Sequence, residues 1–173
     1  MNIAPLPPVS SLAGTLVRAR ENAPYLRLSL EVQPELADLL ASENLEAAFE
    51  YSARAGDGAE NVRQKLRREK RALALTLAIG DLAGRLTLTD VITQLSDFAD
   101  RALDEALADI YATRYPDASL EGFSIIGLGK HGSRELNYSS DIDPIFIYDP
   151  DKIPVRGRED PSDAARRIGQ QLV

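Results

Sequence analysis

The residues best suited to do chemistry lie in one short segment, Gly127 to Asp143, which reads GLGKHGSRELNYSSDID. Two aspartates, Asp141 and Asp143, stand two positions apart at the start of an apolar run that ends at Tyr148. Side chains at i and i+2 of a strand point to the same face, so the two carboxylates could jointly hold one or two Mg²⁺ ions. Taken alone, such a pair more often caps a helix or forms a turn.

Three glycines and a serine come before this aspartate pair. Gly127, Gly129 and Gly132 allow the backbone to approach a ligand closely. Gly132 and Ser133 are predicted to start a short helix, whose free N–H groups can bind a phosphate. Without the aspartates, these glycines would indicate only a tight turn. The carboxylates follow one connection later, where metal ions could bridge the same phosphate, and this order favours a phosphate site.

The other polar residues of the segment each have two interpretations. Lys130 could pair with a phosphate, although an exposed lysine without such a role is the commoner outcome. Ser139 and Ser140 could donate hydrogen bonds to a phosphate, or they could only shape the turn before the strand. His131, the single histidine of the chain, is interpreted as a packing or surface residue rather than a base.

A strand, turn, strand pattern must position these residues. Residues 123–126 form a short β-rich run, and residues 142–148 form a second apolar run. Asp160 and Pro161 then predict the N-cap and first residue of a further helix. The predicted fold class is α+β, with a helical leader over residues 1–115 and a core that starts at residue 116 and runs to 173.

The leader reads as helices with short breaks from about residue 10 to residue 115. Pro34 suits a helix start, residues 45–51 form a second short helix, and residues 55–58 form a loop. Apolar residues recur at helical spacing from Val62 to Gly80. Thr89 or Asp90 is predicted to cap a long helix from Val91, with one apolar face and one acidic face.

Composition limits the possible chemistry. The chain has 173 residues and no cysteine, which excludes disulfides and thiolate nucleophiles, and leaves carboxylates as the metal ligands. No apolar run approaches the roughly 20 residues of a membrane span, and the start lacks the pattern of a signal peptide, so we expect a cytoplasmic protein that contacts no membrane. The net charge of -7 works against binding nucleic acid.

One run of the sequence is strongly basic. Its six members would suit nucleic acid, but no aromatic residues are interleaved to stack on bases. The exposed face of a helix explains the run, and docking on a protein partner or on another domain is an intermediate interpretation. The six residues are Arg63, Lys65, Arg67, Arg68, Lys70 and Arg71.

The segment also resembles a known family. Its glycines, the residues Arg134-Glu135-Leu136-Asn137 and the run Ser139-Ser140-Asp141-Ile142-Asp143 are similar to the signature of glutamine synthetase adenylyltransferase/adenylyl-removing enzymes, members of the polymerase β-like nucleotidyltransferases. The sequence departs at His131, where the family usually has an apolar residue, and at Ser133, where it usually has glycine. Upstream, residues 66–68 and 80–84 are weakly similar to the helical leader of that family.

The resemblance implies a Mg²⁺-dependent enzyme that removes AMP from, or adds AMP to, a tyrosine of glutamine synthetase, with ADP or ATP as the nucleotide. Asp141 and Asp143 would then be the catalytic metal ligands, while Gly132, Ser133 and Lys130, with Ser139 and Ser140, would contact phosphate. The position of the segment close behind Met1 favours the adenylyl-removing half. A PII-type nitrogen-signalling protein is left open as a regulatory partner.

A third carboxylate on a strand, which such sites usually need, is missing from the pattern. The acidic residues after Asp143 fall in predicted turns or helix starts, so we expect the chain alone to be inactive. The alternative is a non-catalytic helical interaction module that retains a vestigial nucleotide-binding motif. The later acidic residues are Asp149, Asp151, Glu159, Asp160 and Asp163.

Overall fold

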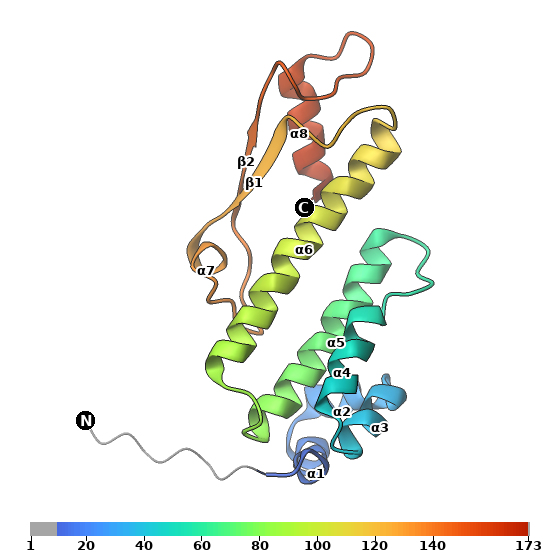
Figure 1. Cartoon of the computed structure of the whole chain (residues 1–173), viewed down its shortest axis with the longest axis vertical. Coiled ribbons are helices and arrows are strands. Elements are labelled where there is room, and N and C mark those ends of the chain that lie inside the picture. Colours follow the sequence, from blue (N-terminus) through green and yellow to red (C-terminus); the bar gives the residue numbers. More distant parts are fainter. Residues whose placement is uncertain (1–9, 173) are drawn as a thin grey trace, which may run out of the picture. The chain divides into compact units, whose positions relative to one another are not determined.

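The computed structural model describes residues 10–172, which form two compact units. The first unit comprises the chain up to Val91, and the second begins at Ile92 (Figure 1). This division follows packing and falls inside the long helix α6, Leu88–Arg114. The division predicted from the sequence, between a helical leader that ends at residue 115 and a core that follows it, stays a prediction. Within residues 10–172, no helix combines the length and the apolar character that a membrane crossing needs.

The first unit is helical, as the sequence predicts. Its helices are α1 (Leu12–Asn22), α2 (Pro24–Glu31), α3 (Pro34–Ala41), α4 (Leu45–Arg54) and α5 (Val62–Leu82). Pro34 is the first residue of α3, and Asn44 and Asn61 cap α4 and α5 by accepting the backbone N–H groups three residues ahead, at Ala47 and Gln64. The core joins all five helices through buried aliphatic residues, among them Leu12, Leu30, Leu36, Ala48, Leu75 and Ile79.

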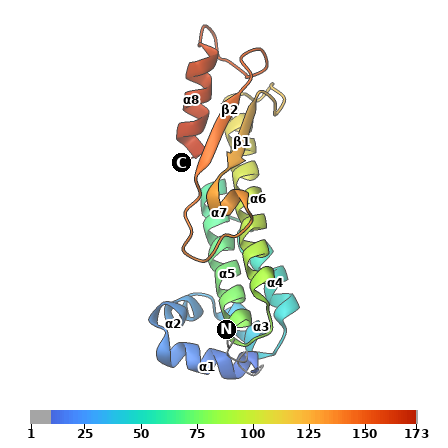
Figure 2. The same ribbon diagram turned by 90° about the vertical axis from the view of Figure 1, so that its left-hand side faces the viewer.

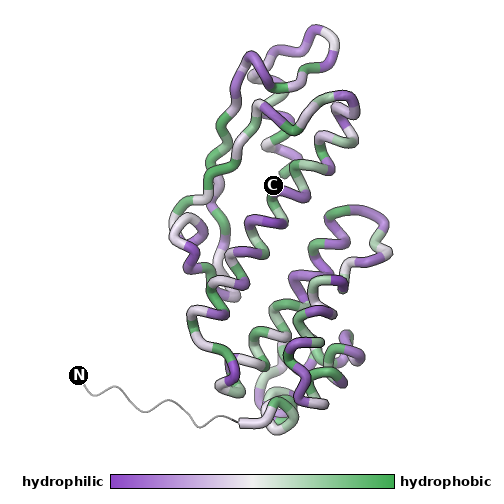
Figure 3. Tube along the Cα trace, viewed as in Figure 1, coloured by the Kyte–Doolittle hydropathy of each residue, from purple (hydrophilic) through white to green (hydrophobic). Residues whose placement is uncertain are grey.

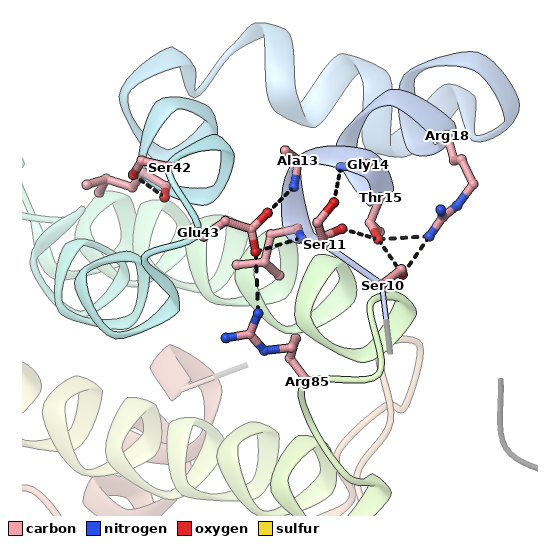
Figure 4. A network of polar contacts seen from close by, with 11 residues as sticks. Ser10, Ser11, Ala13, Gly14, Thr15, Arg18, Ser42, Glu43 and Arg85 are labelled. Atoms are coloured by element: carbon pink, nitrogen blue, oxygen red, sulfur yellow. Dashed lines mark hydrogen bonds and ion pairs between the residues drawn. The ribbon is translucent and has the colours of Figure 1, made fainter. Parts of the chain in front are cut away.

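A glutamate from a distant turn completes the start of α1. The Glu43 carboxylate accepts hydrogen bonds from the backbone N–H groups of Leu12 (3.1 Å) and Ala13 (3.0 Å), and Arg85 lies 3.3 Å from it (Figure 4). The two backbone hydrogen bonds hold the pKa of Glu43 below its usual value. Glu43 thereby ties the turn after α3 to the first turn of α1 and to the turn after α5.

The second unit combines the two strands with helices on one face. β1 (Phe123–Gly127) pairs antiparallel with β2 (Pro144–Tyr148), and Ile125 lies opposite Phe146. Core residues of α6 and α8 (Pro161–Leu172), including Ile110 and Ile168, pack with Phe123 on the inner face (Figure 1). The outer face stays exposed, although both strands are largely apolar (Figure 3). This arrangement agrees with the predicted α+β class.

Two predicted starts of elements were wrong by two or three residues. Helix α6 begins at Leu88, because Thr87 and Asp90 cap each other: the Asp90 carboxylate accepts the Thr87 N–H (2.8 Å), and the Asp90 N–H donates to the Thr87 hydroxyl (3.2 Å). β2 begins at Pro144 rather than at Ile142. The Asp160 cap of α8 is confirmed, since its carboxylate accepts the N–H of Ser162 at 2.8 Å.

Candidate active site

The glycine-rich segment forms a one-turn helix at the end of the strand pair. α7 (Gly129–Gly132) follows β1 directly, at the end of the hairpin where β2 begins (Figure 2). Gly129 has a φ of 54°, a left-handed conformation that a side chain would strain. A Cβ on Gly132 would lie 2.5 Å from the carbonyl oxygen of Gly127. The glycines therefore allow the segment to fold tightly on itself.

The predicted role of Gly132 and Ser133 at a helix start is contradicted. Gly132 is the last residue of α7 and Ser133 is its C-cap. Their N–H groups already donate to the carbonyl oxygens of Leu128 (3.1 Å) and Gly129 (3.0 Å), and are not available to a phosphate. The helix starts three residues earlier, because Leu128 is extended and the left-handed Gly129 lets the chain turn there. The Ser133 hydroxyl donates to the Glu135 carboxylate, 3.1 Å away.

His131 fixes α7 to the long helix α6. Its side chain is only 4% exposed, and its Nε2 lies 2.7 Å from the Asp100 Oδ1. A Cβ on Gly127 would lie 2.8 Å from the Nδ1 of His131, so Gly127 makes room for the imidazole ring. The interpretation of His131 as a packing residue thus agrees with the structure, and its packing depends on one glycine and one aspartate.

Arg134 makes the second link between this segment and α6. Its guanidinium group donates to the carboxylates of Asp97 and Asp100, the latter at 3.0 Å. The hydrogen bond to Asp97 raises the pKa of Arg134 further above its already high usual value. Arg134 has a φ of 59°, which is uncommon for a residue with a side chain. The two aspartates, one helical turn apart on α6, hold the chain as it leaves α7.

The connection from α7 to the aspartate pair is built from local hydrogen bonds. The Asn137 N–H donates to the Ser140 hydroxyl (3.0 Å), and the Asn137 side-chain oxygen accepts the Ser139 N–H (3.0 Å). The Ser140 hydroxyl thus shapes the turn, which was one of its two predicted roles. Lys130 is exposed and forms no ion pair with the residues that the structure describes.

Asp141 and Asp143 lie in the segment immediately before β2, which has no regular secondary structure, instead of within the strand. The Asp143 carbonyl oxygen accepts the Leu128 N–H (3.1 Å), which continues the antiparallel pairing one step beyond the strands. Both side chains are exposed, and neither forms a hydrogen bond or ion pair with another residue between 10 and 172. Two free carboxylates at this spacing have the hard oxygen ligands that suit Mg²⁺.

A third acidic ligand is not found near this pair. In the described part of the chain, no three His, Asp or Glu side chains are grouped so that they could hold a metal ion. Four of the five later carboxylates are already engaged by other groups within residues 10–172. Asp149 caps the turn at Asp151 (3.0 Å), Asp160 caps α8, Asp163 pairs with Arg166 (2.7 Å), and the largely buried Glu159 pairs with Arg114 (3.1 Å).

The structure thus brings two exposed carboxylates to the start of β2, beside a one-turn helix that is fixed at two points. Sequence analysis did not identify Asp97 and Asp100 as part of this site. Their only signal is a spacing of three residues on the acidic face of α6, and that spacing gives no indication of contact with residues more than thirty positions away.

The sequence is similar to known proteins over most of its length. The family model for glutamate-ammonia ligase adenylyltransferase matches residues 11–173. Three bifunctional glutamine synthetase adenylyltransferase/adenylyl-removing enzymes are similar: one from Xanthobacter autotrophicus (34% identical, 91% of this chain), one from Rhizobium meliloti (29%, 91%) and one from Caulobacter vibrioides (38%, 65%).

The chain covers only a small part of these relatives: 16% of the Xanthobacter protein, 18% of the Rhizobium protein and 13% of the Caulobacter protein. No solved structure matches it. The match of the family model runs through both units and includes the whole glycine-rich segment and the aspartate pair. The chain therefore belongs to the glutamate-ammonia ligase adenylyltransferase family.

Proposed function

We propose that this chain is part of a Mg²⁺-dependent nucleotidyltransferase that removes AMP from, or adds AMP to, a tyrosine of glutamine synthetase. The observation that carries the proposal is the pair Asp141 and Asp143, exposed and without side-chain partners among residues 10–172, next to a segment that is anchored on α6. Relatives named for both directions of the reaction support the substrate.

The two directions are the same kind of displacement at phosphorus. In removal, phosphate attacks the phosphorus of the AMP–tyrosine ester, the bond to the tyrosine oxygen breaks, and ADP and a tyrosine hydroxyl result. In addition, the tyrosine hydroxyl attacks the α-phosphorus of ATP and pyrophosphate leaves. Such reactions mainly require positioning and neutralisation of charge, which Mg²⁺ supplies when it is bound.

The chain's own residues would divide this work. Asp141 and Asp143 would hold the ion, because their oxygens are not used elsewhere in the described structure. The Lys130 side chain and the hydroxyls of Ser139 and Ser140 remain as candidate phosphate contacts, whereas Gly132 and Ser133 use their N–H groups within α7. The contacts of His131 and Arg134 with α6 would keep these groups in place while phosphate exchanges.

The proposal is tested with the complete protein, adenylylated glutamine synthetase, phosphate and Mg²⁺, by measuring ADP release. Loss of a metal ligand removes several kcal/mol of transition-state stabilisation, so Asp141→Asn should slow the reaction at least about 100-fold. The control is Asp149→Asn, which keeps an oxygen to accept the Asp151 N–H and should leave the rate unchanged. An unchanged rate in Asp141→Asn would remove this residue from the site.

The second candidate is a non-catalytic module, favoured by the absence of a third grouped carboxylate within residues 10–172. The two candidates differ in their binding of nucleotide. A catalytic lineage predicts that the complete protein binds ADP more tightly with Mg²⁺ than without it, and that Asp143→Asn abolishes the difference. A folded protein that binds no nucleotide under either condition supports the module.

A further inference from the structure

The first half of α5 has an open concavity of about 350 Å³ that is lined by four arginines and two amide side chains. Arg63, Arg67 and Arg71 recur every four residues and therefore share one stripe of the helix, with Arg68 on the adjoining row. At a rise of 1.5 Å per residue, the stripe is about 12 Å long. We call this region the arginine surface; its lining residues are Asn61, Arg63, Gln64, Arg67, Arg68 and Arg71.

The four guanidinium groups have no partner in the part of the chain that the structure describes. All four arginines are exposed, and none forms an ion pair or side-chain hydrogen bond with residues 10–172. The oxygens of the two amides are already used: Asn61 accepts the Gln64 N–H (2.9 Å), and the Gln64 side chain accepts the Glu60 N–H (2.8 Å). The arginines and the NH₂ groups of the two amides are left to meet a ligand, and all of these groups are donors.

This arrangement works against the stability of α5. Like charges four residues apart repel each other along a helix, and here Arg67 has one such neighbour on each side. Basic side chains near a helix N-terminus also oppose its dipole, and the first turn of α5 contains no acidic residue. A stretch with two unfavourable electrostatic features is better explained by a partner of opposite charge than by folding.

The chemistry of the surface points to carboxylates. Residues 63–71 contain six of the chain's 20 basic residues but only one of its 27 acidic residues, so an acidic partner is repelled elsewhere and attracted here. No aromatic side chain lines the concavity, which leaves nucleic-acid bases without a stacking platform. Arginine binds carboxylates through two parallel hydrogen bonds.

We propose that the arginine surface docks an acidic face of a partner protein, whose carboxylates are spaced along about 12 Å. Glutamine synthetase is the partner that we assign to it. That assignment rests on the proposed function, whereas the preference for an acidic protein face rests only on the charges of α5.

The preference is tested with the chain and a defined probe: a helical peptide that carries glutamate at three positions four residues apart. A peptide with glutamine at those positions is the matched control. NMR of the arginine Nε–H groups should show the glutamate peptide perturbing Arg67 and Arg71, with weaker binding as salt is raised. Equal binding of the glutamine peptide, or tighter binding of inorganic triphosphate or single-stranded DNA, would overturn the preference.

A single substitution separates binding from folding. Arg67→Glu replaces two repulsive pairs along the helix by two attractive ones, so the thermal unfolding temperature should rise or stay the same. Its affinity for the glutamate peptide should fall about tenfold or more, since the central charge is reversed. The control is Arg27→Glu, which reverses an exposed arginine of α2 with no ion-pair partner in the described structure and should change affinity less than about twofold. Equal affinity in Arg67→Glu and the unchanged chain contradicts the proposal.

The same variants test the assigned partner. The Kd for adenylylated glutamine synthetase should rise about tenfold or more in Arg67→Glu and change less than about twofold in Arg27→Glu. If Arg67→Glu binds glutamine synthetase as tightly as the unchanged chain does, docking at this surface is overturned, while ADP release by the complete protein still decides the proposed function. If ADP release is absent but the glutamate peptide binds as described, the proposed function fails and the docking surface stands.

Discussion

Replacing Asp100 by alanine should loosen α7 from the long helix α6. Asp100 accepts hydrogen bonds from His131 (2.7 Å) and Arg134 (3.0 Å). The His131 side chain is 4% exposed, so the substitution leaves a buried imidazole N–H without an acceptor, which costs about 1–3 kcal/mol. Arg134 is half exposed and adds little, because water replaces its partner. Alanine favours the helix more than aspartate does, by up to about 0.7 kcal/mol, so the net loss should be about 0.5–2 kcal/mol.

Amide hydrogen exchange at Gly132 and Ser133 measures this loss where it occurs, because their N–H groups close the turn of α7. A net loss of about 0.5–2 kcal/mol should make both amides exchange about 2- to 30-fold faster. The control is Asp104→Ala, which removes an exposed carboxylate of the same helix that has no partner among residues 10–172, and should leave both rates unchanged. Unchanged rates in Asp100→Ala, or equal acceleration in Asp104→Ala, would refute the anchoring role.

Three further outcomes are expected. Gly132→Val should destabilise the chain by about 1–3 kcal/mol in urea unfolding, since its Cβ would lie 2.5 Å from the Gly127 carbonyl oxygen. Lys130→Ala should change the free energy of unfolding by no more than about 0.5 kcal/mol. The reverse order would show that α7 does not pack this way. Hydrogen bonds from Thr87 hold the pKa of Asp90 in the folded chain below its usual value, so the cap stabilises the fold above the pKa of Asp90 in the unfolded chain, near 4, and this stabilisation is lost as the pH falls through the lower folded pKa. Asp90→Asn should therefore weaken the acid-induced loss of helix seen by circular dichroism. Superimposable curves of the two proteins would contradict this. The chain by itself should release no ADP from adenylylated glutamine synthetase, because a two-stranded sheet with two free carboxylates positions too little of the reaction, and a rate close to that of the complete protein would contradict it.

The helical elements could be predicted closely because their signals are local. Pro34 at the start of α3 and Asp160 before α8 act on the backbone within one turn of themselves. Apolar residues at helical spacing then indicate which stretches continue. The start of α6 was missed because Thr87, Thr89 and Asp90 are all good caps, and only the reciprocal bonds between the first and the last of them decide the register.

The contacts that hold the candidate site could not be predicted, because they join residues far apart in the sequence. No local pattern shows that Asp100 accepts a hydrogen bond from His131. The same holds in the first unit, where no local pattern shows that Glu43 caps α1. The placement of Gly132 and Ser133 failed for a related reason. A glycine signals conformational freedom, and both Gly129 and Gly132 have it, but only the backbone shows that the left-handed turn occurs at Gly129.

The prediction of a shared face for Asp141 and Asp143 does not require the strand that it assumed. Asp141 and Asp143 were expected on one face of a strand, yet β2 begins only at Pro144. Proline has no N–H to donate to a ladder, which suits the first residue of a strand. Proline also favours extended conformations for the residue before it, so we expect Asp143 to be extended although it lies outside β2. Alternation of side chains needs only an extended backbone, and a shared face for the two carboxylates therefore stays a prediction that metal binding by Asp141→Asn and Asp143→Asn can test.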